Sequence, residues 1–315
     1  MALGKNALFL LACFFLLTSC GGSPSGPGGS QRDIVFYDRE PDWSRDGNKI
    51  VYISKGDLEE GVYGGLYVVG VKTKQRRLVL SDDTELHGPR WSPDGNWIVF
   101  SRYGNIYKVW HRGGIPEQLT FGNSDFHPSW STNGNYIVFG RTSGPAPGIY
   151  AMTSEGNSLS LLFAKGHSPD WFPDGRHLAL LLSDTEGVPQ VARFSVVDSS
   201  VEFLTSDRIL DKEHLRVSPD GTRVMYARRE GDKAPRLFIV NIHTQHVQEL
   251  PGNGGFTGTW SPDGNYIAHD DPFDGAIYIR NLLENTELQI SPGVKSRDPV
   301  WDTLLIEQDD YPGGS

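Results

Sequence analysis

The chain has 315 residues, of which 29 are lysine or arginine and 39 are aspartate or glutamate, so its formal net charge is −10. This acidity argues against nucleic acid or anionic lipid headgroups as the main partner. The acidic residues are dispersed, without a long run of one sign, which is most simply a solubility feature.

The first residues are typical of an export signal. Lys5 precedes an apolar run over residues 7–17, which is too short and too close to the terminus for a comfortable transmembrane span. The run ends in residues 17–20 (LTSC), which resemble the bacterial lipobox, where small residues precede a cysteine that is lipidated. We therefore predict a lipoprotein signal peptide over residues 1–19 and lipid attachment at Cys20. An ordinary secretory signal or an uncleaved anchor is the alternative.

A flexible tether is expected to follow the lipidated cysteine. Residues 21–30 (GGSPSGPGGS) contain no apolar side chain that could anchor them, so residues 20–32 are predicted to hold Cys20 and this tether. Residues 33–308 are predicted to form one domain, and residues 309–315 a tail. Cys13 would leave with the signal peptide and Cys20 would carry lipid, so no thiol remains for a disulfide, a metal site or a nucleophile.

One short phrase recurs through the domain, and its clearest copy is residues 91–100 (WSPDGNWIVF). The spacing of its tryptophans, or their equivalents, is roughly forty residues, which is typical of propellers and solenoids. The copies cover residues 43–52, 91–100, 130–139, 171–180, 217–226 and 260–269, and a worn copy covers 298–306.

The phrase favours strands over helices. Ser-Pro-Asp-Gly is turn chemistry, because proline presets φ and glycine takes the left-handed conformation that other residues resist. The alternating apolar residues that follow, such as Ile98 and Phe100, indicate a strand. No sustained apolar period of 3.6 residues supports a helical solenoid. The predicted fold is therefore an all-β propeller of four-stranded blades.

The number of blades depends on the worn copy. Counting it gives seven blades, with the last one built from Trp301, residues 304–307 and the N-terminal residues 34–37. Such a join of the two chain ends would remove free sheet edges. Six blades, with the chain ends overlapping on one blade, is the alternative.

The phrase Pro-x-Trp-Ser-Pro-Asp-Gly-x-x-Ile-Val-Phe at residues 89–100 resembles the WD-type repeat of the TolB propeller family. Similar repeats occur in propeller domains of dipeptidyl-peptidase-like enzymes and of oligogalacturonate lyases. The resemblance covers nearly all of the expected mature chain and implies the propeller fold. TolB itself is a soluble periplasmic protein with a further N-terminal domain, and it binds the peptidoglycan-associated lipoprotein. We expect this chain to depart from TolB in its own lipobox and in having no room for that domain.

Candidate binding residues lie three or four positions before each repeat tryptophan, where a propeller chain enters its central channel. Four histidines from successive blades would then surround one mouth, and histidine is a common metal ligand that titrates near neutral pH. Polar lining of a wet channel, a ligand or partner site, and a bound metal are the three interpretations. The residues are Arg39, Glu40, His87, His127, His167, Glu213, His214, Arg297 and Asp298.

The repeat tryptophans, in contrast, are predicted to be core between blades. Neither a Gly-x-Ser-x-Gly elbow, a phosphate loop nor a His-Glu-x-x-His motif is present in the sequence. We expect a non-catalytic envelope lipoprotein that holds a protein or glycan and needs no cofactor. Its predicted location is the outer membrane, facing the periplasm, attached by lipid alone. A metal-assisted polysaccharide lyase or hydrolase acting at the channel mouth is the alternative.

Overall fold

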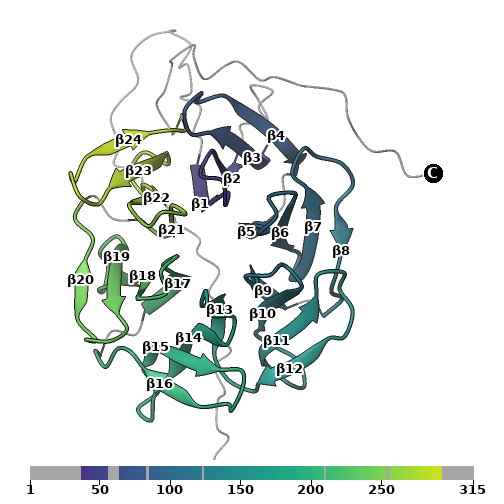
Figure 1. The fold of residues 1–315 in the computed structure, drawn as a ribbon, viewed down its shortest axis with the longest axis vertical. Helices are drawn as coiled ribbons and strands as arrows, with labels where there is room; N and C mark the ends of the chain where they lie inside the picture. Colours follow the sequence, from purple (N-terminus) through teal and green to yellow (C-terminus); the bar gives the residue numbers. More distant parts are fainter. Residues whose placement is uncertain are drawn as a thin grey trace, which may run out of the picture. The chain divides into compact units, whose positions relative to one another are not determined.

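The structure of the protein is a computed structural model that describes residues 37–55, 64–82, 85–122, 124–208, 211–252 and 255–292. All of them belong to one compact unit, residues 33–315. The regular elements in these ranges are β-strands, and none of these ranges contains a helix long and apolar enough to cross a membrane. The strands form six four-stranded sheets around a central axis (Figure 1).

Each sheet is one blade, in which consecutive strands pair in chain order from the axis to the rim (Figure 1). The blades are numbered 1 to 6 in the order of their first strands along the chain. The first strands are β1 (Tyr37–Trp43), β5 (Leu86–Trp91), β9 (Asp125–Trp130), β13 (His167–Trp171), β17 (Asp211–Val217) and β21 (Gly258–Trp260). The second strands are β2 (Lys49–Lys55), β6 (Trp97–Arg102), β10 (Tyr136–Arg141), β14 (His177–Ser183), β18 (Arg223–Arg229) and β22 (Tyr266–Asp270). The third strands are β3 (Gly65–Gly70), β7 (Asn105–Trp110), β11 (Gly148–Thr153), β15 (Pro189–Ser195), β19 (Arg236–Asn241) and β23 (Ile277–Asn281). The fourth strands are β4 (Arg76–Ser81), β8 (Glu117–Gln118), β12 (Ser160–Phe163), β16 (Val201–Phe203), β20 (Val247–Glu249) and β24 (Glu287–Gln289).

The repeated phrase forms the hairpin turn between the first and second strands, as the sequence predicted. In blade 2, Gly95 has a φ of 74°, and its N–H donates to the carbonyl of Ser92 at 2.9 Å. The Ser92 hydroxyl accepts from the N–H of Trp97 at 2.9 Å, and the Asp94 carboxylate accepts from the N–H of Asn96 at 3.1 Å. The serine and aspartate of the phrase therefore satisfy backbone donors that the turn leaves unpaired.

The core lies between neighbouring blades. Val51 and Leu66 of blade 1 pack against Trp91, Ile98 and Phe100 of blade 2, and each of these side chains is at most 6% exposed. The repeat tryptophans belong to this core, because Trp43, Trp91, Trp130 and Trp260 are all at most 9% exposed. The predicted core role is confirmed for these four tryptophans; Trp171 is only partly buried against the core, and Trp301 lies outside the described residues.

The expectation of seven blades is wrong, and the six-bladed alternative is correct. Blade 1 meets blade 6 directly: the N–H of Asp38 donates to the carbonyl of Gly275 at 2.8 Å, and the N–H of Glu40 donates to the Thr257 hydroxyl at 3.1 Å. Tyr37 begins β1 and pairs with Lys55 inside blade 1, so it does not complete a further blade. These direct contacts leave no gap for another sheet. The worn copy at 298–306 lies outside the described residues.

Candidate functional site

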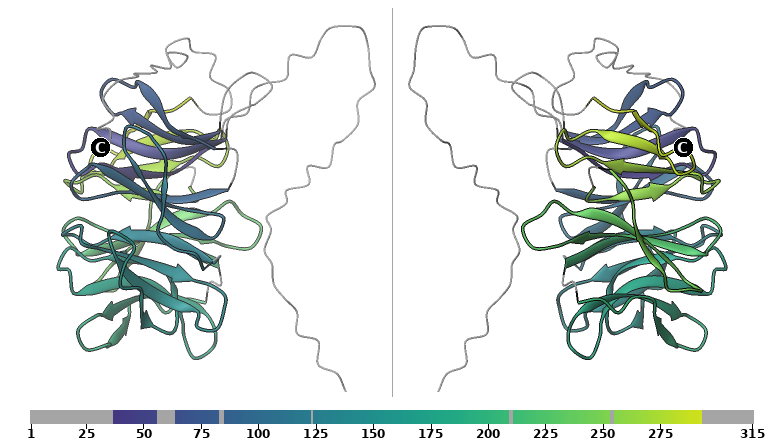
Figure 2. Two further views of the ribbon diagram at one scale, coloured as in Figure 1. Left: turned by 90° about the vertical axis from the view of Figure 1, so that its right-hand side faces the viewer. Right: turned by 90° about the vertical axis from the view of Figure 1, so that its left-hand side faces the viewer.

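The first strands of the blades surround the central channel, and each runs from one face of the propeller to the other (Figures 1 and 2). Side chains at equivalent positions of these strands therefore form layers at successive depths. We number the depths from the repeat tryptophan, whose place in blade 5 is taken by Val217. Positions four and three residues before it lie at one end of the channel, and the tryptophan itself lies at the other.

The strand is irregular at the position three residues before the tryptophan. Glu40, His127, Ser168 and His214 stand there with φ between 53° and 54°, and Gly88 has a φ of 58°. The pairing register of the first strand shifts at these residues, for example between Arg39 and Asp42 and between Glu213 and Arg216. A bulge of this kind redirects side chains, and a left-handed residue other than glycine costs on the order of 1–3 kcal/mol. Such backbone strain concentrates at functional sites, so this end of the channel is the candidate site.

We call this end the histidine mouth and define it by Arg39, Glu40, His87, His127, His167, Glu213 and His214. Glu40 is its most enclosed member, with 5% of the residue exposed. The Glu40 carboxylate accepts from the N–H of Gly88 and lies 3.3 Å from Nδ1 of His87 and 3.8 Å from Nε of Arg39. Burial alone would raise the pKa of Glu40, but the hydrogen bond and charge of His87, with Arg39 and His214, hold it well below its usual range. Glu40 is therefore an anion at neutral pH.

The rings of His127 and His214, from blades 3 and 5, pack against each other. Their ring centroids are 5.2 Å apart with the ring planes at 78°. Burial, followed by the charge of His214, lowers the pKa of His127 to about 3, so this imidazole is neutral at pH 7. Nε2 of His214 lies 3.5 Å from a carboxylate oxygen of Glu213. This contact lowers the pKa of Glu213 to about 2, although burial opposes the shift.

The rim of the mouth is formed by side chains four residues before the tryptophan. His87 and His167 are in this outer position, and His167 is exposed, with Nδ1 3.2 Å from the Ser168 hydroxyl. Phe126 packs edge-on against His87 at 6.4 Å. The four histidines therefore occupy two depths of the channel, whereas the sequence predicted that they form a single ring.

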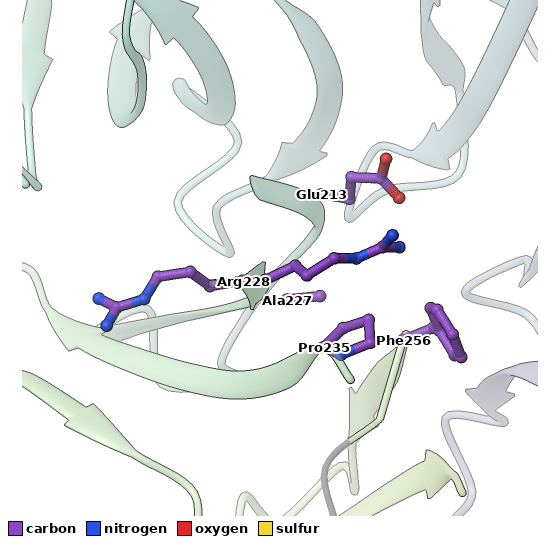
Figure 3. Close-up of a pocket in the computed structure, with 6 residues that line it drawn as sticks. Glu213, Ala227, Arg228, Pro235 and Phe256 are labelled. Atoms are coloured by element: carbon purple, nitrogen blue, oxygen red, sulfur yellow. The ribbon is translucent and has the colours of Figure 1, made fainter. Parts of the chain in front are cut away.

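Between blades 5 and 6 the rim continues in a small pocket (Figure 3). Glu213, Pro235 and Phe256 line it, and the Arg229 guanidinium lies 5.9 Å from the ring centroid of Phe256. The pocket has a volume of about 10 Å³, which is near the smallest space that holds one water molecule. It therefore adds a polar and aromatic edge to the mouth, and it is too small to be a ligand cavity.

The remaining predicted site residues cannot be placed. Arg297, Asp298 and Cys20 lie outside the described residues, so their roles stay predictions. Within the described ranges, no three histidine, cysteine, aspartate or glutamate side chains are grouped so that they could hold a metal ion. The histidine mouth thus offers carboxylates, a neutral imidazole and arginines for hydrogen bonding and ion pairing. It gives the metal-assisted lyase hypothesis no set of ligands in this part of the chain.

The structure also reveals a layer of charges that the sequence reasoning missed, one residue before the tryptophan. Arg90 bridges two aspartates, with Nε 3.1 Å from Asp42 and Nη2 2.6 Å from Asp170. The Ser129 hydroxyl also donates to Asp170, at 2.8 Å, and the Thr259 hydroxyl donates to Asp42 at 3.3 Å. We call these residues, with Arg216, the charge layer. Its side-chain contacts join blades 1, 2, 3, 4 and 6 below the histidine mouth, and Asp170 reaches blade 5 through the N–H of Val217.

A signal for this layer was present in the sequence. Residues one and three positions before the tryptophan recur in every copy of the phrase, and in the structure both positions lie beside the channel. Asp42, Arg90, Asp170 and Arg216 hold the inner of these positions; Arg90 is partly exposed and the other three are buried. From blade 1 to blade 6 this position is aspartate, arginine, serine, aspartate, arginine and threonine, so no single residue type repeats in every blade, and the position did not stand out in the sequence.

Beyond the charge layer the channel opens into a wider hollow, which we call the tryptophan mouth. Its volume is about 570 Å³, within the range of roughly 300–1,000 Å³ that is usual for ligand sites. The walls come from the repeat tryptophans and from residues two positions later. The lining includes Trp43, Trp91, Trp130, Trp171, Trp260, Arg45, Pro93, Thr132, Pro173, Pro219 and Pro262, with Asp42, Arg90, Arg216 and Thr259 of the charge layer.

The fold and the channel define a six-bladed β-propeller with a polar opening at one end and an aromatic opening at the other. Comparison with known proteins identifies the family of this propeller. The family described as TolB beta propeller domain matches residues 39–263, and the chain belongs to this family.

Individual relatives agree with this assignment. The Tol-Pal system protein TolB of Francisella tularensis subsp. holarctica is 30% identical over 240 residues, which cover 70% of this chain and 54% of that protein. This chain thus spans about half the length of that relative. The crystal structure of TolB from Acinetobacter baumannii has a TM-score of 0.64 at 20% identity and covers 84% of this chain and 65% of that one. An oligogalacturonate lyase in complex with manganese has a TM-score of 0.55 at 13% identity, over 82% of this chain and 78% of that one. At these identities the two structures show the fold alone.

Proposed function

We propose that the protein is a non-catalytic binding module of the bacterial cell envelope, and that a protein or glycan partner docks at its histidine mouth. The observation that carries the proposal is the left-handed backbone of Glu40, His127, Ser168 and His214, at the same depth in four blades. Backbone strain repeated at one end of a channel supports a binding role for that end.

The electrostatics of the mouth support recognition through hydrogen bonds. Glu40 and Glu213 stay ionised at neutral pH, while His127 stays neutral, so acceptors of different kinds surround one opening. Arg39 adds a donor at the rim, where its Nη2 already donates to the carbonyl of Leu86 at 3.2 Å. Groups that are held in place by one another lose little entropy when a partner binds.

The family supports an envelope role with a protein partner. The Francisella relative is named as a protein of a Tol-Pal system, and this chain matches about half of it. We further propose that Cys20 carries lipid, and that it ties the propeller to the outer membrane on its periplasmic side. The metal-assisted lyase is not proposed, because no observation of the described residues favours it.

Affinity purification from detergent-solubilised envelopes tests the proposal. A variant with His87, His127, His167 and His214 changed to Ala is compared with the wild type, after circular dichroism has shown that both are folded. His243→Ala/His246→Ala is the matched control, because both of these histidines are exposed outside the channel.

We expect an envelope protein to co-purify with the wild type and the control and to be lost from the fourfold variant. Sedimentation with purified cell-wall glycan tests the glycan partner in the same three proteins. Equal recovery of every binding partner by the folded fourfold variant would contradict the proposal.

A further inference from the structure

Arg216 is a buried charge that has no ion-pair partner among the residues that the structure describes. The residue is 8% exposed and lies at the floor of the tryptophan mouth. Its one side-chain hydrogen bond to the described residues goes from Nη1 to the carbonyl of Leu215, at 2.8 Å. Nε has no hydrogen-bond partner there, and no carboxylate of the described ranges lies within ion-pairing distance of the guanidinium. An ionised group in this position is costly unless a counter-charge reaches it.

The nearby aspartates, Asp170 and Asp42, form no ion pair with Arg216, because their carboxylates already bind Arg90 and backbone N–H groups. Asp170 accepts from Arg90 at 2.6 Å and from the N–H of Val217 at 2.8 Å. Asp42 accepts from Arg90 at 3.1 Å and from the N–H of Trp91 at 2.8 Å. Burial and the charge of Arg90 lower the pKa of Arg216 to about 10, which still leaves it protonated at neutral pH. The charges of Asp170, Asp42 and Glu40 oppose this shift, but none of these carboxylates forms an ion pair with Arg216 in the described ranges, so the floor presents a cation without a direct partner to the hollow.

The walls above this cation combine apolar rings with small polar side chains such as Thr132. Pro93, Pro173, Pro219 and Pro262 line the hollow in four blades, beside the repeat tryptophans. Arg45 lies at the rim, and Arg90 and Arg216 line the floor together with Asp42, so positive charges outnumber negative ones in the lining. A ligand that complements this hollow needs a carboxylate at its inner end and apolar groups along its sides.

We propose that the tryptophan mouth binds an acidic peptide segment, in which one carboxylate pairs with Arg216 and apolar side chains lie between the proline rings. The carboxylate would match the planar, multiply donating guanidinium. This site is at the opposite end of the channel from the histidine mouth, and it does not depend on the function proposed for that mouth.

The packing of two repeat tryptophans, Trp130 and Trp260, favours a peptide ligand over an acidic sugar. Nε1 of Trp130 donates to the carbonyl of Arg90, and Nε1 of Trp260 donates to the carbonyl of Arg216, each at 3.2 Å. These bonds hold the indoles between blades, where both residues are at most 8% exposed. A sugar ring stacks on an open aromatic face, which the indoles of Trp130 and Trp260 do not offer, although Trp171 is partly exposed. The proline rings instead form a lining that suits aliphatic, proline or aromatic side chains.

Selection from a random octapeptide library displayed on phage tests the proposal, with the full chain as the target. We expect the selected peptides to be enriched in aspartate or glutamate next to proline or aromatic residues. Fluorescence polarisation of the best peptide then gives its Kd for wild type, Arg216→Met and Thr132→Glu. Thr132 is exposed in the lining, so Thr132→Glu adds a repelling carboxylate without disturbing the core.

Arg216→Met should raise the Kd by about tenfold or more, because a charge-assisted hydrogen bond contributes roughly 1.5–3 kcal/mol. Thr132→Glu should raise the Kd by a similar factor, because its carboxylate repels that of the peptide. Thr132→Gln and Arg208→Met are the matched controls and should bind as the wild type does, since the Arg208 side chain is 84% exposed away from the hollow. The fourfold histidine variant should also keep the peptide, which separates this proposal from the proposed function.

Selected peptides without acidic enrichment would overturn the proposal, and so would an unchanged Kd in a folded Arg216→Met. If Arg216→Met does not fold, Thr132→Glu decides alone, and an unchanged Kd there refutes the site. Binding of a glucuronate oligomer, with no acidic peptide selected, would assign the hollow to a glycan and reject the peptide.

Discussion

The neutral imidazole of His127 predicts that stability falls as the solution becomes acidic. In the unfolded chain a histidine binds a proton below about pH 6.5. In the folded protein, burial and the charge of His214 lower the pKa of His127 to about 3, with His167 and Arg216 acting in the same direction and Glu40 against them. Unfolding between pH 6.5 and pH 3 therefore takes up a proton at this residue, so stability is lost as pH falls through that window.

The size of the effect follows from these two pKa values. Between pH 7 and pH 5 the unfolded imidazole goes from mostly neutral to mostly charged, while the folded one stays neutral. The corresponding loss of unfolding free energy is up to about 2 kcal/mol. This figure is a ceiling, because the His127 side chain is only half-buried and channel water screens part of the interaction.

His127→Asn tests the reasoning, because asparagine tolerates the left-handed backbone and does not titrate. Urea unfolding of wild type and variant at pH 7 and pH 5 gives the difference directly. The contribution of His111, whose pKa burial lowers to about 4, is present in both proteins and cancels. His243→Asn, at an exposed turn, should keep the wild-type pH dependence. If His127→Asn loses as much stability as wild type between the two pH values, the neutral state of His127 is refuted.

Three other changes test the fold and the anchor. Gly95→Val should lower the unfolding free energy by about 1–3 kcal/mol through backbone strain alone, because φ is 74° and a Cβ there meets no atom within 4 Å; an unchanged urea midpoint would reject the turn. Asp170→Asn removes one of the two anions that Arg90 bridges, so we expect a loss of about 3 kcal/mol in the same assay; a loss below about 1 kcal/mol would show that the charge layer is not structural. Cys20→Ala should release the protein from the membrane fraction after cell lysis; continued fractionation with membranes would contradict the lipid anchor.

Much of the fold could be predicted from the sequence, because each blade is specified locally. The Ser-Pro-Asp-Gly turn at residues 92–95 and the alternating strand after it need only nearby residues to form. The blade count is different, since it depends on which blade closes the ring. The contact of Asp38 with Gly275 joins residues far apart in the sequence, and no local pattern contains it.

The candidate site could be predicted only in part. The sequence placed His87, His127, His167 and His214 near one end of the channel, but their division into two depths comes from the left-handed bulge. That bulge depends on the pairing of the first and second strands, which the residue types do not show. Arg216 was missed for a related reason: it has no ion-pair partner among the described residues, and only the structure reveals this.

Site-specific photo-crosslinking in intact envelopes is the most direct test of the central claim that the histidine mouth holds a partner. A photoreactive amino acid replaces His167, which is exposed at the mouth, and Leu283, which is 86% exposed on the β23–β24 hairpin, serves as the control. We expect a discrete crosslinked product from position 167 and none from position 283. The same products from both positions, or none from position 167, would contradict the account.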